Sequence, residues 1–90
     1  MSGTEISAKY QQAVADVKAL TATDNQKLAM YGYFKYVEIG KCNTERPTGW
    51  TDFVGKAKWD AWNEIDASLS KEQVMQKYID LVESIKAGGA

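Results

Sequence analysis

The sequence predicts an all-α protein, a small four-helix bundle formed by a single domain over residues 1–90. Three observations lead to this fold class. Four stretches repeat apolar residues at intervals of three and four, which places these side chains on one face of a helix. Two of the stretches begin with a capping-box pattern. The chain also has one proline and seven glycines, too few turn-forming residues for an all-β chain of short strands.

The first expected helix begins near Ile6 and ends near Leu20. Its apolar stripe recurs in steps of four, three, four and three, at Ile6, Tyr10, Ala13, Val17 and Leu20. Ser2 or Thr4 is expected to cap its N-terminus, because a hydroxyl oxygen there can accept from the free backbone N–H groups of the first turn.

The second expected helix begins after Thr23, where Thr23 to Gln26 has the capping-box pattern, and ends at Gly40. Two rows of side chains share this helix. One row is expected to face the core and consists of Met30, Tyr33, Phe34 and Val37. The other mixes a phenol, an ammonium group and aliphatic carbons, and consists of Leu28, Tyr31, Lys35 and Ile39.

Residues 41–50 are polar and lack a helical period, so we expect an ordered connecting loop, and loops of this length often carry function. Thr51 is expected to cap a third helix that ends between Asp66 and Ser68. Its apolar row consists of Val54, Lys58, Trp62 and Ile65, with Trp59 beside it.

The fourth expected helix follows a second capping box, Ser70 to Gln73, and ends at Gly88 and Gly89. One face of this helix carries Val74, Tyr78, Leu81, Val82 and Ile85.

Composition excludes several classes of function. The net charge of −1 does not provide the basic surface that nucleic-acid binding needs, so we expect no nucleic-acid partner. The chain has no histidine, the usual general base and a common zinc ligand, and Cys42 is its single cysteine. We therefore expect no metal site and a reducing compartment. Without a long apolar run or a signal-like N-terminus, we expect a cytoplasmic protein with no integral membrane segment.

Two lysines, Lys35 and Lys58, stand inside apolar rows. Lysine is rarely buried without a partner, so each stem either lies along apolar neighbours with its ammonium in water, or the ammonium binds an anion. The spacing alone favours the first reading.

The chain resembles the acyl-CoA-binding protein family, in its small single-domain form. The resemblance runs from about Tyr10 to Lys86 and is strongest in CNTERP, residues 42–47, and in GKAKWDAWNE, residues 55–64. The family's Tyr-x-x-Tyr-Lys pattern corresponds to residues 31–35, where Phe34 stands in place of the second tyrosine. Val54 likewise stands where the family has a lysine.

The resemblance implies a non-enzymatic carrier that forms an intracellular pool of medium- and long-chain fatty acyl-CoA esters. It implies an up-down-down-up arrangement of helices, no cofactor and, as we expect, a monomer. Lysine and tyrosine side chains would hold the 3′-phosphate and adenine end, and the acyl chain would lie in a groove between helices. The implied ligand contacts are Lys18 on the first helix, Tyr31, Phe34 and Lys35 on the second, Val54 and Lys58 on the third, and Tyr78 on the fourth.

An alternative reading is a helical protein-interaction module with an exposed aromatic patch. An enzyme is disfavoured, because Glu45 and Arg46 have no activated nucleophile beside them and are better explained as groups that order the loop. Asp60 and Glu64, one turn apart, are better explained as a solvated face than as a catalytic pair.

Overall fold

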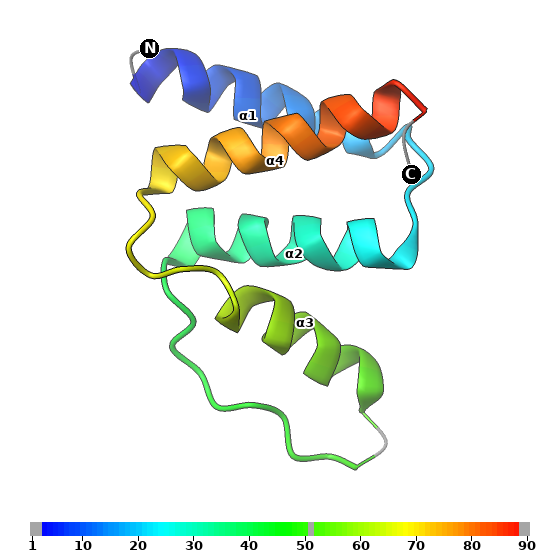
Figure 1. Ribbon diagram of the computed structural model, residues 1–90, viewed down its shortest axis with the longest axis vertical. Coiled ribbons are helices and arrows are strands. Elements are labelled where there is room, and N and C mark those ends of the chain that lie inside the picture. The colour runs from blue at the N-terminus through cyan, green and yellow to red at the C-terminus, as the bar shows by residue number, and fades with distance from the viewer. Residues whose placement is uncertain (1–2, 51, 89–90) are drawn as a thin grey trace.

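The computed structural model describes residues 3–50 and 52–88, and four helices account for most of this range. They are α1 (Gly3–Val17), α2 (Asp24–Ile39), α3 (Phe53–Asn63) and α4 (Lys71–Lys86). The all-α prediction is confirmed. In Figure 1, α1 and α4 run in one direction and α2 and α3 in the other, so the up-down-down-up arrangement is confirmed as well.

The helices lie side by side in the order α1, α4, α2, α3 (Figure 1). α4 packs between α1 and α2, and α2 packs between α4 and α3. The molecule is consequently flat, with extents of 41 × 29 × 17 Å. Each outer helix has one helical neighbour, so the side chains between α2 and α3 are reached by solvent more readily than those beside α4.

Both predicted capping boxes are present. The Thr23 hydroxyl accepts from the Gln26 N–H at 3.1 Å, and the Gln26 amide oxygen accepts from the Thr23 N–H at 2.8 Å. Ser70 and Gln73 repeat this pair of bonds at 3.1 and 2.7 Å. Gly40 ends α2 with a φ of 105°, a value that side chains with a Cβ rarely adopt.

The termini of α1 and the start of α3 differ from the prediction. α1 ends at Val17, so Lys18 and Leu20 lie in the turn after it. Thr4 lies inside α1 and does not precede it, while Ser2 and Thr51 fall outside the described residues. Asp52 caps α3, with its carboxylate accepting from the Gly55 N–H at 3.0 Å.

α3 ends at Asn63, three residues or more before the predicted end. The Asp66 carboxylate accepts from the Ser68 N–H at 2.9 Å, which forms a local turn that competes with helical hydrogen bonds. Tyr36 of α2 also donates its hydroxyl hydrogen to the Leu69 carbonyl at 2.7 Å, which holds the turn against α2.

The core lies where α4 meets α1 and α2. Val74 and Val82 are fully buried, and the Tyr10 and Tyr78 rings meet edge to face with centroids 5.1 Å apart. Burial raises the pKa of both phenols, and for Tyr10 the negative charge of Glu38 adds to the effect. Phe34, predicted to face the core, is instead 38% exposed, because the buried face of α2 includes Tyr36.

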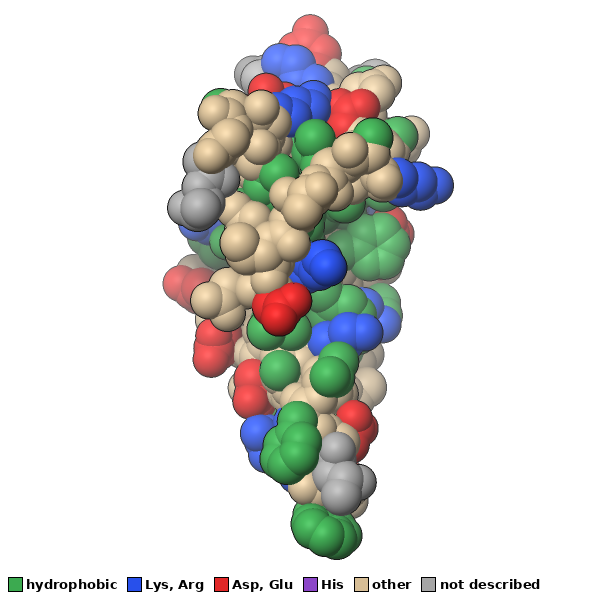
Figure 2. All heavy atoms as spheres, turned by 90° about the vertical axis from the view of Figure 1, so that its right-hand side faces the viewer, with side chains coloured by type: hydrophobic (Ala, Val, Ile, Leu, Met, Phe, Trp, Pro, Cys, Tyr) green, Lys and Arg blue, Asp and Glu red, His purple; other side chains and the backbone are tan. Residues whose placement is uncertain are grey.

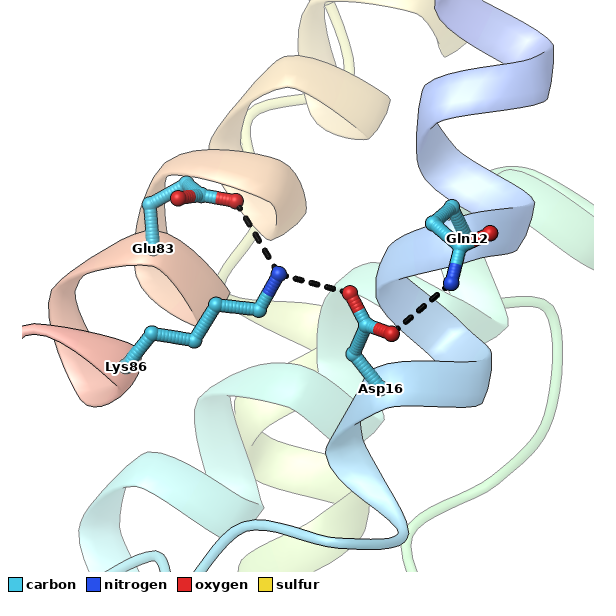
Figure 3. A network of polar contacts seen from close by, with 4 residues as sticks. All are labelled: Gln12, Asp16, Glu83 and Lys86. Atoms are coloured by element: carbon cyan, nitrogen blue, oxygen red, sulfur yellow. Dashed lines mark hydrogen bonds and ion pairs between the residues drawn. The ribbon is translucent and has the colours of Figure 1, made fainter.

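One polar network joins α1 to α4. Lys86 of α4 reaches Asp16 of α1 at 2.6 Å and Glu83 at 3.4 Å, while Gln12 donates to Asp16 at 2.8 Å (Figure 3). The hydrogen bond between Lys86 and Asp16 lowers the pKa of the Asp16 carboxyl and raises the pKa of the Lys86 ammonium group. This network holds the C-terminal end of α4 against α1.

Candidate functional site

Two lysine ammonium groups lie over aromatic rings where α2 and α3 meet. The Lys58 Nζ of α3 lies 5.3 Å from the centroid of the Tyr31 ring of α2. In the opposite sense, the Lys35 Nζ of α2 lies 5.1 Å from the centroid of Trp62 of α3. We call these four residues the α2–α3 seam. Each cation–π contact is worth about 0.5–1 kcal/mol at an exposed site, enough to orient a lysine but not to neutralise it.

Neither seam lysine has a carboxylate within ion-pair distance among the described residues, whereas Arg46 has one and Lys86 has two. Lys35 is half-buried and Lys58 is exposed, so water reaches both ammonium groups. The seam therefore presents two positive charges that an anion can approach. In this arrangement the ammonium groups lie over aromatic rings, and their charges stay available to an anion.

A hollow of about 390 Å³ adjoins the seam at the N-terminal ends of α2 and α3, and we call it the first hollow. Its lining is largely apolar, and Lys58 belongs both to it and to the seam. The lining consists of Asp24, Lys27, Leu28, Phe53, Val54, Ala57 and Lys58. Figure 2, which faces the ends where α2 and α3 begin, shows basic side chains set among hydrophobic ones. A ligand with an anionic group and an apolar tail matches this surface.

The first hollow lies where α2 and α3 diverge from a close backbone contact at Gly32. At Gly32 a Cβ would lie 2.7 Å from the backbone oxygen of Ala61, so only glycine allows the two backbones to come this close. From this contact the helices separate toward their N-terminal ends (Figure 1). The resulting gap is lined by residues one to two turns before the contact.

The long loop before α3 is fastened to α3 along its length. Trp62 donates its indole N–H to the Gly40 carbonyl at 2.8 Å, and Trp59 donates to the Thr44 carbonyl at 3.0 Å. Arg46 forms a two-point pair with Asp60 at 2.9 and 3.1 Å. These contacts order the loop, as predicted for Arg46, and they hold the Trp62 ring beneath Lys35.

Asp60 has a structural partner and is not half of a carboxylate pair. The hydrogen bond from Arg46 lowers the pKa of Asp60 and raises that of the guanidinium group. Within the described part of the chain, no cluster of three His, Cys, Asp or Glu side chains is arranged to hold a metal ion.

The structure brings Tyr31, Lys35, Val54 and Lys58 together but leaves three predicted contacts elsewhere. Val54 lines the first hollow and is 65% exposed. Lys18 is exposed in the turn after α1, a helix that packs against α4 and not against α2 or α3.

Tyr78 lies in the core at 4% exposure, and Phe34 is on an open face of α2. Neither of these two residues is part of the seam or lines the first hollow.

Sequence reasoning missed the role of Trp62 and the lining residues Lys27, Leu28, Phe53 and Ala57. The sequence places Trp62 in the apolar row of the third helix, and it is buried at 4% exposure, yet the ammonium group of Lys35 lies over its ring. Leu28 shares a row with Tyr31 and Lys35, which was the available signal for it. Nothing in the sequence indicated which residues of α3 would lie opposite that row.

No helix in residues 3–50 and 52–88 is both long enough and apolar enough to span a bilayer.

Comparison with known proteins identifies the family. A family model described as "Acyl CoA binding protein" matches residues 7–82. Acyl-CoA-binding domain-containing protein 6 of Danio rerio is 37% identical over 92 residues, a match that covers 100% of this chain and 30% of the relative. The chain thus spans less than a third of that relative's length.

Two solved structures share the fold. The crystal structure of ACBP from Moniliophthora perniciosa has a TM-score of 0.83 and 38% identity, covering 98% of this chain and 83% of that one. Oryza sativa Acyl-CoA-Binding Protein 2 has a TM-score of 0.83 and 29% identity, covering 92% of both chains. Because the family model covers most of the sequence and the fold agrees, this chain belongs to the acyl-CoA-binding protein family, whose members are binding proteins and not enzymes.

Proposed function

We propose that this chain binds medium- and long-chain fatty acyl-CoA esters and acts as a monomeric carrier that keeps a pool of them in the cytoplasm. The observation that carries the proposal is that Lys35 and Lys58, which have no carboxylate partner in residues 3–50 and 52–88, lie beside an apolar hollow. An acyl-CoA ester has this same division, with phosphates and adenine at one end and a hydrocarbon chain at the other.

The seam suits the nucleotide end of the ligand. Charge-assisted hydrogen bonds from Lys35 and Lys58 to the 3′-phosphate would contribute on the order of 1.5–3 kcal/mol each. The Tyr31 hydroxyl would add about 1 kcal/mol. Binding the phosphate replaces no existing ion pair within the described residues, so this gain is not offset by a broken one.

The first hollow suits the acyl chain, because its lining is mostly apolar and it lies within reach of a ligand anchored at the seam. Each methylene removed from water contributes about 0.8 kcal/mol before ordering costs, so a dozen give a gross term on the order of 10 kcal/mol. The chain term is the larger of the two. The seam therefore selects coenzyme A esters over free fatty acids, whereas tight binding depends on the tail.

Val54 contributes apolar surface to the first hollow in this proposal, and the contact of Phe34 with the ligand stays a prediction from the family resemblance. Lys18 and Tyr78 stay predictions from the family resemblance, since one is on the turn after α1 and the other is in the core. If Lys18 contributes, it does so as a long side chain reaching from outside the seam.

Titration with palmitoyl-CoA, followed by calorimetry or tryptophan fluorescence, tests the proposal. Lys58→Ala and Lys35→Ala should each weaken binding by about tenfold or more, while the melting temperature of the free protein changes little. Lys56→Ala is the matched control, because Lys56 is on the same helix as Lys58 but belongs to neither the seam nor the first hollow. Equal affinity of the Lys35 and Lys56 variants would refute the seam as the phosphate site.

The alternative, a protein-interaction module, is favoured by one observation. Trp50, Phe53 and Val54 are 82%, 72% and 65% exposed around the start of α3. If the protein shows no binding of palmitoyl-CoA in the same titration, these side chains become the better candidates for its function.

A further inference from the structure

A second hollow, of about 570 Å³, lies on the other side of the α2–α3 contact. On α2 it is lined by Asn25, Leu28, Ala29 and Tyr33. Ala29 and Tyr33 project from the opposite side of Gly32 to the seam residues Tyr31 and Lys35, as the 100° turn per residue requires. Its lining continues onto the turn after α3 and onto α4. The second hollow is thus separate from the site already described.

Leu28 and Ala57 line both hollows. Ala57 carries only a methyl group, so Leu28 is the one side chain of appreciable size common to the two lining sets. Leu28 lies one turn before Gly32 on the side of α2 that faces α3, and it is half-buried in the widening gap. Its isobutyl group therefore stands between the two spaces.

We infer that Leu28 closes the inner end of the first hollow, an inference that rests on the proposed function. Leu28 thereby sets the acyl-chain length beyond which further methylenes no longer raise the affinity. An acyl chain that enters the first hollow on the Lys58 side fills it and then meets Leu28. Further methylenes stay in water and add little affinity. The second hollow is the space that a longer chain would enter if Leu28 were smaller.

The lining of the second hollow limits how much such an extension would add. Ala29, Tyr33, Ala61 and Leu69 offer apolar contact, but Glu64, Asp66 and Lys77 also line it. Hydrocarbon placed beside charged groups displaces their water, so only the first few methylenes past Leu28 gain from burial. The expected extension is therefore short, about one two-carbon step.

Leu28→Ala tests the inference through the dependence of affinity on chain length, measured from octanoyl-CoA through palmitoyl-CoA to behenoyl-CoA. In the parent protein, affinity should rise by up to about fourfold per methylene and then level off. In Leu28→Ala the plateau should begin about two carbons later, with a relative gain of about tenfold for the ester at that length. Leu28→Val, which removes less, should shift the plateau by a smaller amount.

Ala29→Phe provides the matched control, because Ala29 lines the second hollow and not the first. Alone it should leave the chain-length profile of the parent unchanged. Combined with Leu28→Ala it should return the plateau to the parent's position, since the phenyl ring fills the space that the truncation opened. Melting curves of all variants without ligand show that each is folded.

The possible results separate the inference from the proposed function. If Leu28→Ala weakens every ester by the same factor and the plateau does not move, Leu28 is merely a lining residue and the inference is wrong while the carrier function stands. If Ala29→Phe fails to reverse the shift, the longer chains do not enter the second hollow. If the parent binds no acyl-CoA ester, the proposed function itself fails.

Discussion

Lysines of this protein differ in function because their ammonium groups have different neighbours, a carboxylate in one case and aromatic rings in the others. Lys86 reaches Asp16 at 2.6 Å and serves to join α4 to α1, whereas Lys35 and Lys58 face aromatic rings and have no carboxylate partner within the described residues. An aromatic ring holds an ammonium group in place without cancelling its charge. A lysine on a ring is thus better prepared to bind a phosphate than one in a salt bridge.

Phe34 and Tyr36 provide a contrast between two nearby aromatic residues of α2. Phe34 is 38% exposed, so in Phe34→Tyr the new hydroxyl group should reach water, and the melting temperature should stay nearly unchanged. Tyr36→Phe is the comparison, because it removes the hydroxyl that donates to the Leu69 carbonyl at 2.7 Å, and it should cost about 1 kcal/mol or more. Thermal melts without ligand measure both. A clear loss of stability in Phe34→Tyr would mean that the ring edge is enclosed.

The loop before α3 acts as an extension of that helix, because Trp59, Trp62 and Arg46–Asp60 fasten it at three points. The loop in turn fixes the Trp62 ring against which Lys35 lies. The residues that make the loop rigid are therefore separate from those that face a ligand, although both sets share the surface of α3.

Asp60→Asn should loosen this loop with little effect on global stability. It removes the charge that pairs with Arg46, and an exposed pair adds little to global stability, so faster amide hydrogen exchange should appear at residues 42–49 and not in α4. Glu64→Gln, one turn further along the chain, is the control. Unchanged exchange in Asp60→Asn would show that the two tryptophans order the loop without the ion pair.

Acid should reproduce the effect of Asp60→Asn in the parent protein. Arg46 lowers the pKa of the Asp60 carboxyl below its usual 3.8. The ion pair therefore stabilises the ordered loop fully at pH values above 3.8. The contribution is lost as pH falls through the lowered pKa of the folded state. Loop exchange rates, corrected for the intrinsic pH dependence of exchange, should therefore rise in the parent at the acid end and stay constant in Asp60→Asn.

At the scale of the whole molecule, one glycine sets the distance between α2 and α3. A glycine inside a helix normally weakens it, and replacement by alanine would stabilise an isolated α2 by about 0.5–1 kcal/mol. Here the added methyl would lie 2.7 Å from the Ala61 oxygen and 2.9 Å from its carbonyl carbon, backbone atoms that cannot rotate away. α3 must shift as a body, and the seam and both hollows would shift with it.

Gly32→Ala should therefore destabilise the protein by about 1–3 kcal/mol and weaken acyl-CoA binding as well. Gly49→Ala is the comparison, since its Cβ would meet only the Asp52 Cβ at an ordinary 3.5 Å. Denaturant unfolding and palmitoyl-CoA titration measure the two effects. A stabilised Gly32→Ala variant would show that the α2–α3 contact is looser than the geometry indicates.

The sequence alone was sufficient to predict the four helices, both capping boxes and the end of α2 at Gly40. These features depend on side chains and backbone groups within four residues of one another, which the order of residues specifies directly. It also singled out Lys35 and Lys58, because an ammonium group inside an apolar row is unusual, although their spacing alone favoured solvated ammonium groups and their ligand role came from the family resemblance. The family resemblance added the helix order, which local pattern does not contain.

The tertiary structure alone decided which residues meet across helices. The ring beneath each lysine, the exposure of Phe34 and the burial of Tyr78 depend on how far each helix is rotated and separated from its neighbours. The early end of α3 depends on a local Asp66 turn held by Tyr36, a residue thirty positions away. Such contacts join segments that are distant in the chain. The close approach at Gly32 fixes which residues of α2 and α3 face each other, because two helix backbones can touch only where no Cβ lies between them.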